Sequence, residues 1–416
     1  MLYYRPCCNG EDSWDFCNTS SSIWLVVFGD GNSDGWCWDS DSCARRAASL
    51  PERVGSGKWP AVFSRSESEP GSGWGPSVGA FSKLAEVNPN FYKAYTAYVP
   101  SCSSDLFLGE CEGRTIGSAI DSNFKFCGKA IALAALRSLI PDMERYGADH
   151  VVLVSGAGVL TYIDELSALL PKSAAVSAVC DGCALFDSPP THLPSSPPPA
   201  LALHPLVLSP NSNCTDAFSC GPAETLPTAI KLWASQQKSE CGGWRCLLST
   251  PKQGALGVIG RAAAMMPLLA YHPLYDAAAF AARGTTPAAA NASTAVEVRA
   301  NVLAAVTPAA VVLAPACAQP QSSFTRIQFF HIDVVSSGGA ALNQASRSSR
   351  ARKASRVGAP GAFSHALYDL IHGAASSRVD ACIGPGCNLS CEDRLSLIAT
   401  DQGKHRSAHH HDVDRQ

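Results

Sequence analysis

The sequence predicts one α/β domain in which a mostly parallel β-sheet is flanked by helices and tied by disulfides. Short apolar runs alternate with segments of helical periodicity, and 18 cysteines are spread along the chain in local groups. The chain has 416 residues, of which 46% are hydrophobic and 16% charged, so it can bury a sizeable core. Its formal net charge of −3 argues against a nucleic-acid partner.

Five apolar runs are the predicted strands: 23–28, 95–99, 151–154, 174–179 and 309–314. Four segments are the predicted helices, near 126–147, 158–169, 222–236 and 361–372. Because the runs alternate with the helical segments, we expect the strands to be mostly parallel. No apolar run reaches the roughly 20 residues that a membrane-spanning helix needs, so we expect no transmembrane segment.

Three further stretches are expected to lie outside the core. Residues 188–210 are proline-rich and are predicted to be a solvated insertion. Residues 345–356 are basic and serine-rich, which favours an exposed insertion over a nucleic-acid contact. Residues 396–416 contain clustered histidines, but without a scaffold to fix ligand geometry we expect a disordered tail and no metal site.

The cysteines indicate an oxidising compartment, because disulfide frameworks persist in secreted proteins. Local groups include Cys37/Cys43, Cys214/Cys220, Cys241/Cys246 and Cys382/Cys387/Cys391, and four glycosylation sequons begin at Asn18, Asn213, Asn291 and Asn388. The first residues, MLYYRPCCNGED, lack the apolar stretch of a signal peptide. Either the true N-terminus is missing or the protein is not exported, and we favour a secreted protein with a truncated leader.

Two strand ends carry features of acyl-transfer chemistry. The stretch FGDGNSDGWC after the first strand is a glycine-rich turn, whose backbone N–H groups can converge on an oxyanion. The stretch VVLVSGAGVLTYIDEL, residues 151–166, reads as a buried strand that turns at two glycines into a helix. The only hydroxyl at this turn is Ser155, on the strand side of the first glycine.

Taken together, several motifs resemble the pectin acetylesterase/Notum family of α/β-hydrolases over roughly residues 8–395. They are IWLVVFGDGNSDGWCWDSDSC, NPNFYKAYTAYVPSCSSDLFLG, FKFCGKAIALAALRSL, VCDGCALFD with Asp181 and Asp187, the cysteine-paired segments at 213–233 and 241–246, MPLLAYHPLYDAAAF, and VDACIGPGCNLSC. The resemblance implies a single α/β-hydrolase domain over these residues, with a disulfide-tied lid. It also implies ester hydrolysis by a serine, a histidine and an aspartate.

The resemblance assigns only some of the catalytic residues and oxyanion donors to positions in this chain. Asp276 matches the acid that orients the histidine, and the N–H groups of Gly35 and Trp36 match the oxyanion donors. The family's nucleophile turn reads Gly-x-Ser-Ala-Gly-Gly, whereas here a single residue, Ala157, separates Gly156 from the helix. Ser155 is the remaining hydroxyl, but it precedes the glycine and follows Leu153 by two positions, unlike the small flanks of an elbow nucleophile.

The histidine position is also changed. The family places it three residues after the cysteine of a Pro-Ala-Cys motif, and Pro320 stands there in this chain. His331 is the nearest substitute and His272 is another, although a histidine beside apolar residues is more often structural than catalytic. Cys180 and Cys183 have the spacing of a redox or zinc site, but with no second pair a disulfide is the better interpretation, and no metal or cofactor is expected.

Two hypotheses remain. The first is a carboxylic ester hydrolase with a degenerate catalytic centre, which acts on an acylated extracellular glycan or protein and whose sequence has lost an exon edge or frame at Gly156/Ala157 and near Pro320. The second is an inactive pseudo-hydrolase that binds an acyl or glycan ligand. Asp181, Gly156 and Ala157 are expected to line the site in either case.

Overall fold

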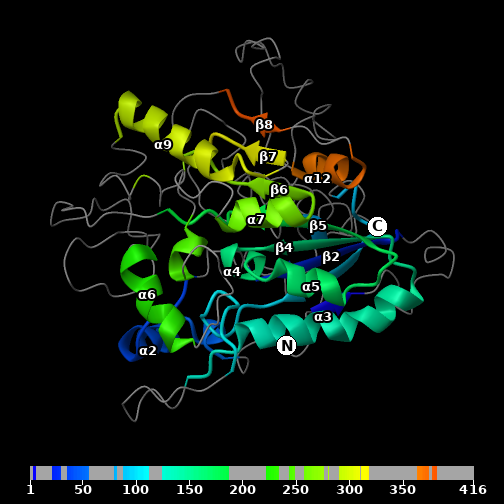
Figure 1. Cartoon of the computed structure of the whole chain (residues 1–416), viewed down its shortest axis with the longest axis horizontal. Helices are drawn as coiled ribbons and strands as arrows, with labels where there is room; N and C mark the ends of the chain where they lie inside the picture. Colours follow the sequence, from blue (N-terminus) through cyan, green and yellow to red (C-terminus); the bar gives the residue numbers. More distant parts are fainter. Residues whose placement is uncertain are drawn as a thin grey trace, which may run out of the picture.

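One eight-stranded sheet organises the chain in this computed structural model (Figure 1). The structure describes residues 3–5, 21–29, 35–55, 79–81, 88–111, 124–186, 222–233, 243–248, 257–275, 280, 290–309, 311–317, 363–373 and 377–381. The strand order is β1-β3-β2-β4-β5-β6-β7-β8. Strand β1 pairs with β3 in the antiparallel sense, and the other six pairings are parallel. The predicted α/β fold class with a mostly parallel sheet is confirmed.

The strands lie at Tyr3–Arg5 (β1), Ile23–Phe28 (β2), Tyr95–Val99 (β3), His150–Ser155 (β4), Ala175–Asp181 (β5), Leu268–Tyr271 (β6), Val311–Ala314 (β7) and Arg378–Val379 (β8). The helices lie at Ser40–Ser49 (α2), Gly128–Arg145 (α3), Ala157–Leu160 (α4), Ile163–Leu169 (α5), Pro222–Leu232 (α6), Val258–Met265 (α7), Ala292–Val306 (α9) and Phe363–Ile371 (α12). Short 3₁₀ turns lie at Pro51–Arg53 (η2), Gly79–Phe81 (η4) and Gly243–Leu247 (η7).

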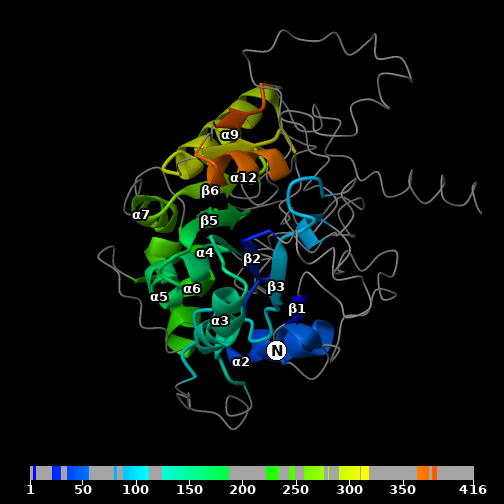
Figure 2. The same cartoon turned by 90° about the vertical axis from the view of Figure 1, so that its right-hand side faces the viewer.

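The central strands are apolar on both faces because helices cover both faces. Along β2, Trp24, Val26 and Phe28 pack toward one core, while Leu25 and Val27 pack toward the other. Residues of α3, α4, α5, α7 and α9 join the first core, and α12 covers the second (Figure 2). The alternation of side chains along each strand therefore divides the buried residues into two layers.

Two predicted strands, 23–28 and 95–99, have the observed bounds, and the other predicted elements differ from the structure at one or both ends. One predicted helix is divided. The segment 158–169 is divided into α4 and α5, because Tyr162 leaves the helical conformation at φ −128° and ψ 30°. The hydroxyl of Thr161 donates to the carbonyl of Gly158 at 2.7 Å, which satisfies an acceptor at the end of the short α4.

Three disulfides join described residues: Cys37 to Cys43, Cys111 to Cys127, and Cys180 to Cys183. The first joins two members of one local cysteine group, and the third agrees with the expectation that Cys180 and Cys183 take part in a disulfide. No helix within the described part of the chain is long and apolar enough to cross a bilayer. The predicted insertions at 188–210 and 345–356 and the tail at 396–416 lie outside the described residues, so the domain boundaries stay predictions.

Candidate active site

The candidate site lies at the edge of the sheet where the parallel strands end. Strand β4 ends at Ser155, β5 at Asp181, β6 at Tyr271 and β7 at Ala314. In Figure 1 this edge faces the side of the molecule that carries α2 and α6. Ligand sites of open α/β sheets lie outside the carboxyl ends of their strands, so this edge is where the predicted residues should meet.

The turn after β4 has an ordinary backbone. Gly156 is extended at φ −83° and ψ −176° and caps α4, which begins at Ala157. Among the described non-glycine residues, positive φ angles occur at 104, 106, 107 and 111, and so not in this turn. A nucleophile elbow holds its serine on a sharp, strained strand-to-helix turn, and that conformation is missing at residues 155–157.

The only hydroxyl of the turn is also buried. Ser155 is 1% exposed, and its neighbour in the ladder is Cys180 of β5. Its Oγ donates to the carbonyl oxygen of Gly156 at 3.1 Å. The hydroxyl proton is therefore directed at the backbone, and the structure holds Ser155 as the last residue of a strand and not at the tip of a turn.

Helix α4 is packed closely against the segment 104–107. A Cβ at Gly158 would overlap the carbonyl of Leu106, so only a glycine allows this approach. The phenol of Tyr162 donates to the carbonyl of Phe107 at 2.9 Å. Burial raises the pKa of this phenol well above its ordinary value, and the carboxylates of Asp105 and Glu165 add to the shift.

The described end of the predicted oxyanion loop, residues 35–37, has a defined conformation. Gly35 has φ +65°, which favours glycine, and a disulfide joins Cys37 to Cys43 in α2. The N–H of Cys37 donates to the carbonyl of Ser104 at 3.1 Å. The loop is thus fixed on one side to α2 and on the other to the segment that packs against α4.

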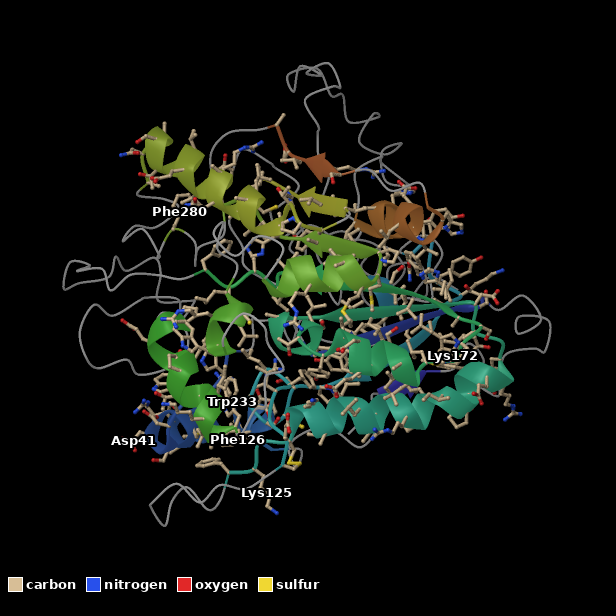
Figure 3. All side chains as sticks on the ribbon, viewed as in Figure 1. Asp41, Lys125, Phe126, Lys172, Trp233 and Phe280 are labelled. Atoms are coloured by element: carbon tan, nitrogen blue, oxygen red, sulfur yellow. A yellow bond between two sulfur atoms is a disulfide. The ribbon has the colours of Figure 1, made fainter. Side chains whose placement is uncertain are left out.

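Helix α6 holds the same loop from a distant part of the sequence. The indole N–H of Trp36 donates to the hydroxyl of Thr225 at 3.1 Å, and the indole N–H of Trp233 donates to the carbonyl of Cys37 at 3.0 Å. Figure 3 labels Trp233 at the end of α6 that lies beside α2. Both bonds are buried, so α6 fixes the side chain of Trp36 and the backbone next to it.

Asp105 is a buried residue whose role sequence patterns did not predict. Its Oδ1 accepts from the hydroxyl of Ser103 at 2.7 Å and from the N–H of Phe107 at 3.1 Å. Its Oδ2 accepts from the N–H groups of Gly109 at 3.1 Å and Gly128 at 2.7 Å. Burial raises the pKa of Asp105, and these hydrogen bonds oppose the shift. The four bonds order the left-handed segment that contacts both Cys37 and α4.

The other predicted site residues are only partly described. Asp181 lies buried at the end of β5, between the cysteines of the Cys180–Cys183 disulfide. His272 follows β6 and packs edge-on against Phe186, with ring centroids 5.3 Å apart. Asp276, His331, Asp187 and Pro320 lie outside the described residues. Among the residues that are described, no group of three His, Cys, Asp or Glu side chains could hold a metal ion.

The chain is similar in sequence to known proteins. The family model for pectinacetylesterase matches residues 14–198. The palmitoleoyl-protein carboxylesterase notum1a of Danio rerio is 23% identical over 53% of this chain and 38% of its own length, and notum2 of Xenopus laevis is 26% identical over 55% and 42%. The chain thus spans about two fifths of these relatives.

The fold comparison extends over most of the chain. A crystal structure of the Wnt deacylase Notum from Drosophila superposes with a TM-score of 0.63 and 19% identity, and the match covers 94% of each chain. A second crystal form gives a TM-score of 0.60. With the family-model match and the relatives above, this likeness supports the resemblance found in the sequence motifs. The chain is thus similar to the pectinacetylesterase family over residues 14–198, and it has the fold of the Drosophila Notum structures.

Proposed function

We propose that this protein is a carboxylic ester hydrolase of the pectin acetylesterase/Notum type by descent, with a catalytic centre that is degenerate at the nucleophile turn. In this proposal the polypeptide binds an acyl ester through its retained oxyanion loop and turns it over slowly or not at all. The observation that carries the proposal is the state of Ser155, which is 1% exposed and donates its proton to the carbonyl of Gly156.

The chemical argument starts from what a serine esterase requires. The serine Oγ must reach the acyl carbon while a base accepts its proton, and backbone N–H groups must then stabilise the oxyanion. Ser155 presents neither a free Oγ nor a strained turn, so the first requirement fails in this polypeptide. Loss of a triad member leaves only the residual rate that binding and oxyanion donors supply.

The retained loop supports a role in binding. Gly35 and Trp36 are held by α2 and α6 through the Cys37–Cys43 disulfide and the Trp36–Thr225 hydrogen bond. A preorganised pair of N–H groups can bind the carbonyl oxygen of an ester without cleaving it. The relatives are named for palmitoleoyl-protein esters and the family model for pectin acetyl esters, so we propose an acylated protein or glycan as the ligand.

The proposed compartment is the secretory pathway. Three disulfides join described residues in a chain with 18 cysteines, which is typical of proteins that fold under oxidising conditions. This part of the proposal explains how the oxyanion loop keeps its bridge to α2. It is tested by whether the protein made in its own cells carries these disulfides.

The alternative is an active carboxylesterase whose transcript encodes the missing turn. The ordered oxyanion loop favours this reading, because the loop has no catalytic use without a nucleophile. Sequencing the transcript across residues 150–165 separates the two. A Ser-Ala-Gly-Gly segment between Gly156 and Ala157 supports the active enzyme, whereas the sequence SGAGVL supports the degenerate centre.

The decisive experiment compares matched variants of the purified full chain. We expect the native protein to hydrolyse p-nitrophenyl acetate and p-nitrophenyl octanoate no faster than Ser155→Ala does. One variant inserts Ser-Ser-Ala-Gly-Gly after Gly156, and its control inserts Ser-Ala-Ala-Gly-Gly. If the variant with inserted Ser-Ser-Ala-Gly-Gly hydrolyses the esters and its Ser-Ala-Ala-Gly-Gly control does not, the rest of the centre is functional. Native turnover that disappears in Ser155→Ala contradicts the proposal.

A further inference from the structure

We propose that Asn291 carries an N-linked glycan while its side chain caps helix α9. Residues Asn291, Ala292 and Ser293 form an Asn-x-Ser sequon without proline at the middle position. The sequons at Asn18, Asn213 and Asn388 lie outside the described residues, whereas this one is placed by the structure. The proposal rests on the secretory compartment proposed above and is independent of catalysis.

The sequon lies where a sugar chain can be accommodated. Asn291, Ala292 and Ser293 are all exposed, and the first buried residue of the helix is Ala295. Asn291 has φ −77° and ψ 169°, so it is extended and outside the helix. Since a bulky glycan requires a surface position, a sequon at the start of an exposed helix meets the steric condition.

The cap leaves the reactive atom of Asn291 available. Oδ1 accepts from the N–H of Thr294 at 2.9 Å, from the Thr294 hydroxyl at 3.0 Å and from the Ser293 hydroxyl at 2.7 Å. All three bonds end on the oxygen, and the glycan is attached to Nδ2. In the transfer, Nδ2 forms a bond to C1 of a lipid-diphosphate oligosaccharide, the C1–O bond to the diphosphate breaks, and Nδ2 releases one proton. The amide oxygen keeps its lone pairs, so the capped helix and the glycan are compatible.

The topology places this glycan at the candidate site's edge of the sheet. Helix α9 connects β6 to β7, and these two strands are parallel. A helix in such a crossover runs antiparallel to both strands, so α9 begins at their carboxyl ends. Figure 1 shows α9 extending outward beside β7 and β8. The glycan at Asn291 therefore projects from the side on which β4 ends at Ser155.

Site-resolved mass spectrometry tests the proposal. The full chain is expressed with a cleavable leader in a eukaryotic secretory pathway, and the secreted protein is treated with peptide N-glycosidase in ¹⁸O water. This treatment converts each glycosylated asparagine to ¹⁸O-labelled aspartate. We expect labelled aspartate at 291, and the loss of one glycan in both Asn291→Asp and Ser293→Ala. Ser293→Thr, which preserves the sequon, should keep the glycan.

The outcomes test glycosylation at Asn291 separately from the proposed ester hydrolysis. Unmodified asparagine at 291 in the secreted protein overturns it, whatever the occupancy at Asn18, Asn213 and Asn388. Compared with Ser293→Ala, which lacks the glycan but keeps Asn291, an equal thermal midpoint in Asn291→Asp supports the capping role of Oδ1, because aspartate can still cap the helix. A lowered midpoint in that variant contradicts the claim that only Oδ1 serves the cap. Neither result depends on whether the chain hydrolyses esters.

Discussion

Replacing Asp105 with alanine should destabilise the protein more than an ordinary buried substitution. The change leaves the N–H groups of Phe107, Gly109 and Gly128 without the acceptor that each has in the native fold. A buried donor that loses its partner costs about 1–3 kcal/mol. Three such donors would cost about 3–9 kcal/mol, and because water can enter the vacated space we expect the lower part of that range, about 3–5 kcal/mol.

The asparagine variant has a smaller predicted effect. If its amide nitrogen replaces Oδ1, the Ser103 hydroxyl can rotate to accept a hydrogen bond, and only the N–H of Phe107 then faces another donor. We expect Asp105→Asn to cost about 1–3 kcal/mol and Ser103→Ala, which removes one neutral donor, about 1 kcal/mol. Urea unfolding followed by tryptophan fluorescence measures the series. A loss below about 1 kcal/mol in Asp105→Ala would refute the proposed role of this carboxylate.

Three further perturbations test other parts of the structure. Burial, together with the charge of His372, lowers the pKa of His150. The folded state thus binds fewer protons than the unfolded state, and stability should fall as pH drops through about 6.5, with a flatter urea-midpoint profile in His150→Gln. Gly158→Ala should cost about 1–3 kcal/mol despite better helix propensity, because its Cβ would overlap the carbonyl of Leu106. Relative to Ser293→Ala, which lacks the glycan and keeps Asn291, Asn291→Ala should cost about 1 kcal/mol through loss of the cap, and Asn291→Asp only a few tenths, both by thermal melting.

Each of these predictions has an outcome that contradicts it. Parallel pH profiles for the parent and His150→Gln would mean that His150 does not carry the acid sensitivity. A more stable Gly158→Ala would mean that α4 has room to move away from the 104–107 segment. Equal melting temperatures for the alanine and aspartate variants at 291 would mean that the Asn291 cap contributes nothing to folding.

Sequence patterns identified most of the sheet, because buried parallel strands are continuous apolar runs. The runs at 23–28 and 95–99 gave strands with the observed bounds. Helix α9 was not predicted, since its alanine-rich sequence has few large apolar residues to mark a face. The sequence did hold one signal for its start, the asparagine cap at 291.

The candidate site was predicted less completely, because its supports come from distant parts of the chain. The motif around Gly35 and Trp36 was visible, but the bonds from Thr225 and Trp233 depend on how α6 packs. Asp105 appeared within a family motif without a role, since its four donors become neighbours only in the folded chain. The roles assigned to Asp276 and His331 stay predictions.

The most direct test of the degenerate centre is covalent labelling of the folded protein. The full chain and Ser155→Ala are incubated with a fluorophosphonate, and intact masses are compared under conditions in which both remain folded. Because the Oγ of Ser155 is buried and donates to the carbonyl of Gly156, we expect no adduct on either protein. A stoichiometric adduct on the native chain that is absent from Ser155→Ala would contradict the account and identify Ser155 as a functional nucleophile.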